Sequence, residues 1–108
     1  MKVRRVAQRA IDYNLSLPIS QRAAYKVEKG KRIAGTGMRT ARRLANNNVD
    51  EAQARLMAAW FARHGESERQ SQARQDKTSK AAVAWALWGG NSGRQWVNAL
   101  LREIERNK

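Results

Sequence analysis

The 108-residue sequence contains no cysteine, one proline, one histidine and only nine acidic residues. Without cysteine the chain forms neither disulfides nor thiolate metal sites, which favours a reducing, intracellular setting. No apolar run approaches the ~18 residues of a membrane-spanning helix. No segment alternates apolar and polar residues as a half-buried strand does. We therefore predict an all-α, compact single domain of five or six short helices, without metal or cofactor.

The scarcity of acids leaves a large and uneven positive charge. The 22 Lys and Arg residues give a net charge of +13. Residues 1–48 carry twelve of these cations against two acids, whereas residues 49–108 carry ten against seven. A field of this sign attracts polyanions, and nucleic acid, the commonest of them, binds largely by releasing condensed counterions. The alternative is a solvated surface that needs no partner.

Apolar residues at helical spacing divide the basic half of the chain. They recur every three or four positions over residues 2–14, so we expect residues 1–17 to form a basic N-terminal helix or arm. Pro18 separates this segment from a helical domain over residues 18–108. There, a second helix is expected from Ser20 to about Gly30. A third covers residues 38–46, with Thr36 as its cap.

The helix expected over residues 51–64 is the clearest of the first two-thirds. Asp50, with Gln53 three residues later, indicates a capping box at its start. The same helix places large apolar side chains on one broad face. His64, near its C-terminal end, is assigned a capping or packing role. The polar stretch 65–78 follows, which we expect to be mobile or only partly helical.

Three tryptophans, Trp85, Trp88 and Trp96, surround a glycine-rich turn over residues 89–93. We expect Thr78 or Ser79 to cap the helix before this turn, and Asn91 or Ser92 to cap the helix after it. Glycines that adopt positive φ would end the first helix and let Trp85 or Trp88 pack on Trp96. The turn lacks the strand and spacing of a dinucleotide motif, so a structural role is preferred. The predicted structural core is Leu56, Trp60, Phe61, Trp85, Trp88, Gly89, Gly90, Trp96 and Leu100.

Basic side chains are the candidate functional residues. Three arginines lie on the outward face of the helix at 38–46, and three cations share a face of the helix expected before it. A glycine-containing loop with two further cations joins these helices, where a single phosphate could sit at a helix N-terminus. The predicted nucleic-acid-binding residues are Arg22, Lys26, Lys29, Lys31, Arg32, Arg39, Arg42 and Arg43. Such cations contact phosphates and specify no base sequence.

A helix-turn-helix interpretation stays open for helices 38–46 and 51–64. It would require recognition side chains at the start of the second helix, where Gln53 and Arg55 are the useful ones. A helix–helix connection without ligand is the simpler interpretation of residues 30–37. Neither the single histidine nor the nearby acids form an arrangement typical of catalysis.

Three blocks carry a resemblance: residues 37–44 (GMRTARRL), 55–64 (RLMAAWFARH) and 82–96 (AVAWALWGGNSGRQW). In this order they resemble a small helical module that recurs in tailed-bacteriophage proteins. The module occurs as short stand-alone proteins and within larger proteins associated with head assembly. The resemblance covers residues 20–101 and leaves out the basic helix at 2–14. It implies a phage origin and brings no catalytic residue with it.

Together these features predict a non-enzymatic, phage-type basic protein that binds nucleic acid through the phosphate backbone. We expect it to act as part of the virion or during packaging. Its location would be the cytoplasm of an infected bacterium, the virion, or both. The alternative is a protein–protein adaptor, either a virion structural component or an inhibitor of a host protein. Such an adaptor would turn the basic face to an acidic protein surface.

Overall fold

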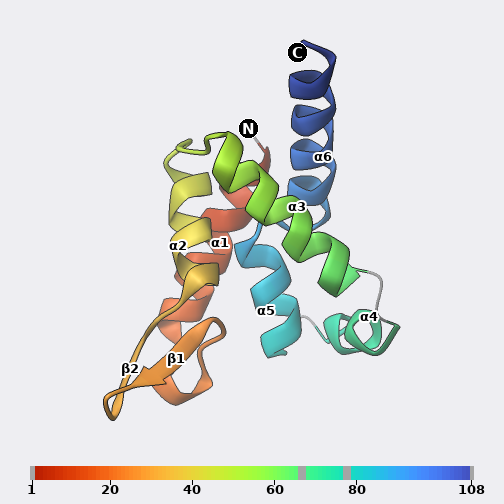
Figure 1. Ribbon diagram of the computed structural model, residues 1–108. Coiled ribbons are helices and arrows are strands. Elements are labelled where there is room, and N and C mark those ends of the chain that lie inside the picture. The colour runs from red at the N-terminus through yellow and green to blue at the C-terminus, as the bar shows by residue number, and fades with distance from the viewer. Residues whose placement is uncertain (1, 66–67, 77–78, 108) are drawn as a thin grey trace.

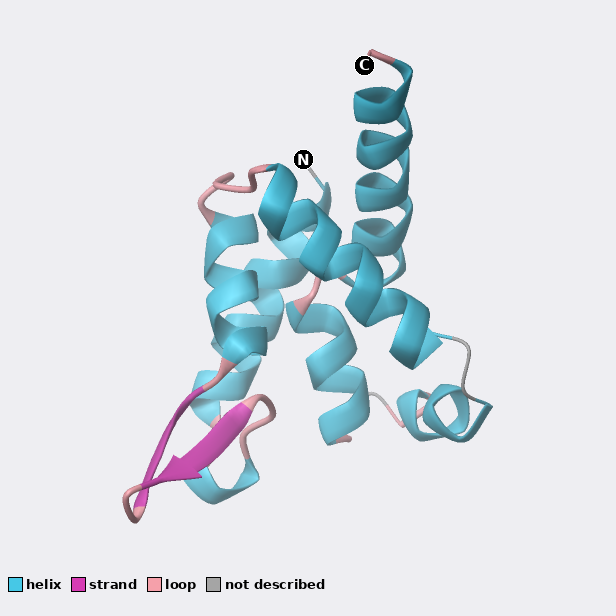
Figure 2. Cartoon of the chain, viewed as in Figure 1, coloured by secondary structure: helices cyan, strands magenta, loops and turns pink. Residues whose placement is uncertain are grey.

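Helices form most of the chain in the computed structural model, which describes residues 2–65, 68–76 and 79–107 (Figures 1 and 2). The elements, in chain order, are α1 (Lys2–Ser16), a 3₁₀ turn (Ile19–Gln21), β1 (Tyr25–Glu28), β2 (Lys31–Ala34), α2 (Thr36–Ala45), α3 (Glu51–Gly65), α4 (Glu68–Arg74), α5 (Lys80–Leu87) and α6 (Gly90–Arg106). The mostly helical class predicted from the sequence is confirmed. The hairpin of β1 and β2 is the exception to it.

The N-terminal helix α1 belongs to the core. It packs on α2, α5 and α6, and Val3, Ala7 and Ile11 on its inner face are buried. It runs antiparallel to α2. This direction is shown by Arg4, near the start of α1, whose Nε donates at 3.2 Å to the carbonyl of Ala45, the last residue of α2. The helix predicted over residues 2–14 is therefore confirmed, but it is packed within the domain and is not an extended arm.

Residues 25–34 form an antiparallel hairpin where the sequence predicted the end of a helix, so the helix expected from Ser20 to Gly30 is wrong. Lys29 and Gly30 both have positive φ, 53° and 78°. This pair makes the two-residue type I′ turn that matches the twist of the strands. The Gly35 amide donates to the Ala24 carbonyl at 2.7 Å and closes the base of the hairpin. Figure 2 shows the hairpin, in magenta, projecting from the helical body.

A buried asparagine attaches this segment to α1. Asn14 is fully buried, and its Nδ2 donates to the Ala23 carbonyl at 3.0 Å. In return the Ala23 amide donates to Asn14 Oδ1 at 2.9 Å. The amide side chain thus satisfies both backbone groups of a residue nine positions away, where the chain leaves the helical body and enters the hairpin.

Helices α2 and α3 lie close to their predicted positions, and their caps differ in part. Met38, Ala41 and Leu44 of α2 are fully buried, as their spacing predicts. Gly35, and not Thr36, is the N-cap residue of α2, and it makes no side-chain cap bond. Asp50 Oδ1 accepts from the Gln53 amide at 2.8 Å, so the predicted cap of α3 forms. The Gln53 side chain does not complete a capping box, because it donates to Thr40 Oγ1.

The polar stretch after α3 is helical in part, as predicted: α4 covers Glu68–Arg74. Ser79 then caps α5, since its Oγ accepts from the Ala82 amide at 3.1 Å. The same Oγ donates to the Ala73 carbonyl near the end of α4, which joins the two helices. Thr78, the other predicted cap, lies outside the described residues.

The glycine turn between α5 and α6 has the structural role predicted for it. Gly89 and Gly90 are buried with φ of 104° and 65°, values that L side chains rarely adopt. A Cβ on Gly93 would lie 2.6 Å from the Trp88 carbonyl oxygen, so only glycine fits this approach of α6 to α5. Asn91 does not cap α6, and its Oδ1 accepts from Trp85 Nε1 at 2.9 Å.

The tryptophan side chains of α5 pack on α3 rather than on Trp96. Trp88 stacks on Trp60 with ring centroids 4.6 Å apart and planes 8° apart, and Trp85 meets Phe61 edge to face at 4.9 Å. Phe61, Trp85 and Trp88 are buried, whereas Trp60, Trp96 and Leu100 are partly buried against the core. Leu56 was predicted to be core and is 42% exposed, because the apolar face of α3 is wider than the surface that covers it.

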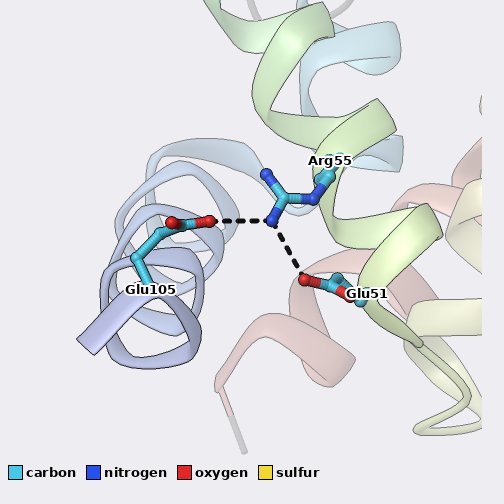
Figure 3. A network of polar contacts seen from close by, with 3 residues as sticks. All are labelled: Glu51, Arg55 and Glu105. Atoms are coloured by element: carbon cyan, nitrogen blue, oxygen red, sulfur yellow. Dashed lines mark hydrogen bonds and ion pairs between the residues drawn. The ribbon is translucent and has the colours of Figure 1, made fainter. Parts of the chain in front are cut away.

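A charged contact holds the last turns of α6, which extend beyond the helical body (Figure 1). Arg55 of α3 donates through Nη2 to Glu51 and to Glu105 of α6, each at 2.9 Å (Figure 3). Its hydrogen bonds to Glu105 and then to Glu51 raise the pKa of Arg55. The guanidinium group thus ties two helices whose contacting residues are 50 positions apart in sequence.

Candidate nucleic-acid interface and an adjoining cavity

Seven of the eight predicted phosphate-binding residues are exposed on the hairpin and on α2. One of them, Lys26 of β1, pairs with Glu28. Of the others, Lys29 lies in the hairpin turn, two cations begin β2, and the three arginines of α2 face away from the core. These six residues are Lys29, Lys31, Arg32, Arg39, Arg42 and Arg43. Since only Gly35 separates β2 from α2, the hairpin continues from the N-terminal end of the helix, as Figure 1 shows. The structure thus places these cations on two consecutive elements.

The acids of the basic half do not neutralise these six cations. Glu28 pairs with Lys26 of its own strand at 3.6 Å, and Asp12 accepts from Gln8. Within the described ranges, no ion pair involves Lys29, Lys31 or Arg32, nor the arginines of α2. Arg39 Nη2 donates to Thr36 Oγ1 at 3.3 Å, which leaves its charge uncompensated.

Two predicted binding residues have other contacts, because the helix assumed to align them does not form. Arg22 donates to the carbonyls of Leu17 and Leu15, at 3.0 and 3.1 Å, and to the Tyr25 hydroxyl at 3.2 Å. It is partly buried and caps the end of α1. Lys26 is exposed and forms the ion pair with Glu28. Arg22, Lys26 and Lys29 therefore share no helical face, and the prediction that they do is wrong.

The start of α3 does not offer free recognition side chains. Gln53 is half-buried and bonded to Thr40, and Arg55 is held by two carboxylates. In addition, α2 packs mainly on α1, whereas α3 packs on α6. A helix-turn-helix unit needs its second helix to project polar side chains into a groove. This arrangement gives such a unit no support.

A cavity of about 660 Å³ opens beside the hairpin base. Its volume lies within the range of about 300–1,000 Å³ that is common for ligand sites. Five parts of the chain meet there: the hairpin base, the start of α2, the middle and end of α3, the end of α4, and α5. The aromatic residues that line it are Tyr25, Trp60, His64, Trp85 and Trp88.

Small residues keep this cavity open. Ala81 and Ala84 of α5 lie on the same helical face as Trp85 and Trp88, so the wall alternates small and large side chains. On the opposite side, a Cβ on Gly37 would lie 2.7 Å from the Ala24 Cβ and 3.3 Å from Trp88 Nε1. Gly37 therefore lets α2 begin directly against the tryptophan.

Four basic side chains also line the cavity and are called its cationic rim below. The basic residues that line it are Arg22, Arg63, Arg74 and Lys80, and no described lining residue is acidic. Arg74 lies 4.0 Å above the Trp85 ring and donates to the His64 carbonyl at 3.1 Å. Lys80 donates to the Ser20 carbonyl at 3.4 Å. Their acceptors are neutral carbonyls, and no acid of the described residues pairs with them.

Sequence reasoning missed this site because its residues come from distant segments. His64 was assigned a packing role, and its ring lies 4.5 Å from Trp60 in agreement with that role. The exposed Leu56 also lines the cavity. The recurrence of Ala81, Ala84, Trp85 and Trp88 on one face of α5 was the one available signal, and it equally suits a packed core.

Comparison of the chain with models of protein families, with curated proteins and with solved structures gives no match. None of the helices in the described ranges combines the length and the apolar character needed to cross a bilayer. Over the same ranges, His, Asp and Glu side chains form no group of three that could hold a metal ion.

Proposed function

We propose that this protein is a non-enzymatic nucleic-acid-binding protein that contacts the phosphate backbone through the hairpin and α2. The observation that carries the proposal is the set of six exposed cations on these two consecutive elements that pair with no described acid: Lys29, Lys31, Arg32, Arg39, Arg42 and Arg43. Lysines and arginines presented in this way neutralise phosphates and release counterions. These contacts position the protein on the nucleic acid and add affinity, but they do not select a base sequence.

The dimensions of the two elements suit a short duplex segment. The ten residues of α2 extend about 15 Å at ~1.5 Å per residue. The four-residue strands of the hairpin extend about 13 Å at ~3.3 Å per residue. Placed end to end, they would span at most about 28 Å, which is the length of roughly eight base pairs. A single copy would thus contact a limited number of phosphates.

The phage association, in the virion or during packaging in an infected bacterium, is part of the same proposal. It is supported by the resemblance of the three sequence blocks at 37–44, 55–64 and 82–96. A backbone-binding protein without sequence preference would suit a long genome, since every segment offers the same phosphates.

The test measures duplex DNA binding over a salt titration for the double variant Arg42→Gln, Arg43→Gln. Loss of two phosphate contacts lowers the slope of log K against log salt by about 1.8. The matched control is Arg102→Gln, Arg106→Gln on α6, which also lowers the net charge from +13 to +11. We expect the control to keep the original slope. Equal slopes for the two double variants would overturn the assignment to α2.

The second candidate is a protein–protein adaptor that uses the basic face against an acidic surface. It is favoured by Leu56, which is 42% exposed next to the partly buried Trp60. An apolar anchor of this kind keeps its contribution at high salt, whereas phosphate contacts lose theirs. A stoichiometric complex that survives high salt and is lost in Leu56→Ser would support the adaptor and not the nucleic-acid binder.

A further inference from the structure

We propose that the cavity between the hairpin base, α3 and α5 binds a nucleoside phosphate, with the base against its tryptophan wall and the phosphate at its cationic rim. The ligand can be a free nucleotide or one nucleotide of a single strand, since both present the same chemistry. This proposal does not require that the arginines of α2 bind duplex DNA.

The wall of the cavity selects for a planar ring. Trp60, Trp85 and Trp88 line it together. Trp60 and Trp88 stack on each other and Arg74 lies over the Trp85 ring, so a ligand meets mainly the edges of these rings. Aromatic side chains of this kind stabilise nucleobases by stacking and edge contacts, because every base has an apolar π-face. Ala81 and Ala84 leave room for a ring beside the tryptophans. An aliphatic ligand would lose these aromatic contacts.

The rim selects for an anion. Arg63 is exposed at the cavity, and Lys80 and Arg74 are held there by backbone carbonyls. An entering phosphate meets several positive charges there, and no described lining residue is acidic. Thr36 also lines the cavity and offers a hydroxyl group there.

An acidic peptide would satisfy the rim and not the wall. Asp and Glu side chains offer charge without a planar ring, so the tryptophans would gain little from them. The combination of three tryptophans with several cations therefore favours a ligand that carries a ring and a phosphate in one unit.

The experiment is calorimetric titration of the whole protein with four probes: AMP, adenosine, ribose 5-phosphate and a (dA)₈ oligonucleotide. We expect AMP to bind about tenfold or more tightly than adenosine or ribose 5-phosphate, since each lacks one of the two contact classes. Tighter binding of (dA)₈ than of AMP identifies a strand as the source. Exclusion of (dA)₈ with retention of AMP identifies a free nucleotide. Either result supports the site.

Two variants locate the binding. Ala81→Leu fills the cavity without changing charge and should weaken AMP binding about tenfold or more, whereas Ala81→Ser, which stays small, should not. Arg63→Gln should weaken AMP by about three- to tenfold. Its matched control, Arg102→Gln on α6, should have no effect. Because Arg63 is exposed, this variant keeps the test decisive should Ala81→Leu fail to fold.

Several outcomes would overturn the proposal. Equal affinity for AMP and ribose 5-phosphate would mean that the base contributes nothing and that the cavity is only an anion site. Equal affinity for AMP and adenosine would mean that the phosphate contributes nothing and that the cavity is only an apolar site. Unchanged AMP binding in both Ala81→Leu and Arg63→Gln would remove the cavity as the site. A glutamate-rich peptide that binds more tightly than AMP would identify an acidic protein as the ligand. The double variant Arg42→Gln, Arg43→Gln should keep AMP binding, so loss of DNA binding there tests the proposed function separately.

Discussion

Replacement of Asn14 by alanine should destabilise the protein more than any surface change of similar size. The side chain serves both the N–H and the C=O of Ala23, which is only 3% exposed. A buried backbone group left without a partner costs about 1–3 kcal/mol. Two such groups, less about 0.5 kcal/mol for the better helix propensity of alanine, give a loss of about 3 kcal/mol. This corresponds to a fall in Tm of roughly 10–20 °C.

The assay is urea unfolding followed by circular dichroism. Asn98→Ala is the matched control, because Asn98 is exposed on α6 and its loss should be neutral or slightly stabilising. A loss below about 1 kcal/mol for Asn14→Ala would refute the reasoning, since it would mean that water or a shifted backbone satisfies Ala23.

The variant Asn14→Asp adds a pH dependence to the same prediction. A protonated carboxyl can donate to the Ala23 carbonyl and accept from its amide, as the asparagine does. The ionised form loses the donor and is buried without a described cation, so burial raises the pKa of the introduced carboxyl. A raised folded-state pKa means that stability is present at low pH and is lost as pH rises through that pKa. Relative to the natural protein, Asn14→Asp should therefore lose stability from acid to neutral pH, and a constant difference would contradict the contact.

Two further predictions concern α6. Gly93→Ala should lower the free energy of unfolding by about 1–3 kcal/mol, although alanine is the better helix former, because its Cβ would meet the Trp88 carbonyl at 2.6 Å. A gain in stability in thermal unfolding would show that the turn relaxes. Glu105→Gln should speed amide exchange in the last turn of α6 without affecting the core, because it removes the carboxylate that Arg55 holds. Exchange that matches the natural protein would mean that the contact does not restrain this end.

The sequence predicted the helical part of the fold well because its signals are local. The burial of Met38, Ala41 and Leu44 follows from their spacing, and the caps by Asp50 and Ser79 follow from side chains three residues from the amides they accept. The hairpin was missed because its alternation is brief: Tyr25–Glu28 alternates over four residues only, and Lys31–Ala34 does not alternate. Its turn also places a lysine, Lys29, at a positive φ that asparagine or glycine usually takes.

The candidate sites were predictable to different degrees. The exposure of the α2 arginines could be read from helical periodicity, and the position of Arg22 could not, since it depends on a helix that does not form. Leu56 lies on the apolar face of α3 but is 42% exposed and lines the cavity. Amphipathic spacing alone does not show how far a covering surface extends.

The sequence by itself determined the net charge, its concentration in residues 1–48 and the helical class. Charge is a property of composition, and helices satisfy their hydrogen bonds within four residues, so neither needs distant contacts. Only the tertiary structure decided the two hydrogen bonds between Asn14 and Ala23, the stacking of Trp88 on Trp60 and the cavity beside these tryptophans. These features depend on which segments meet in space. That choice is made by the packing of the whole chain and is not encoded in any single stretch of it.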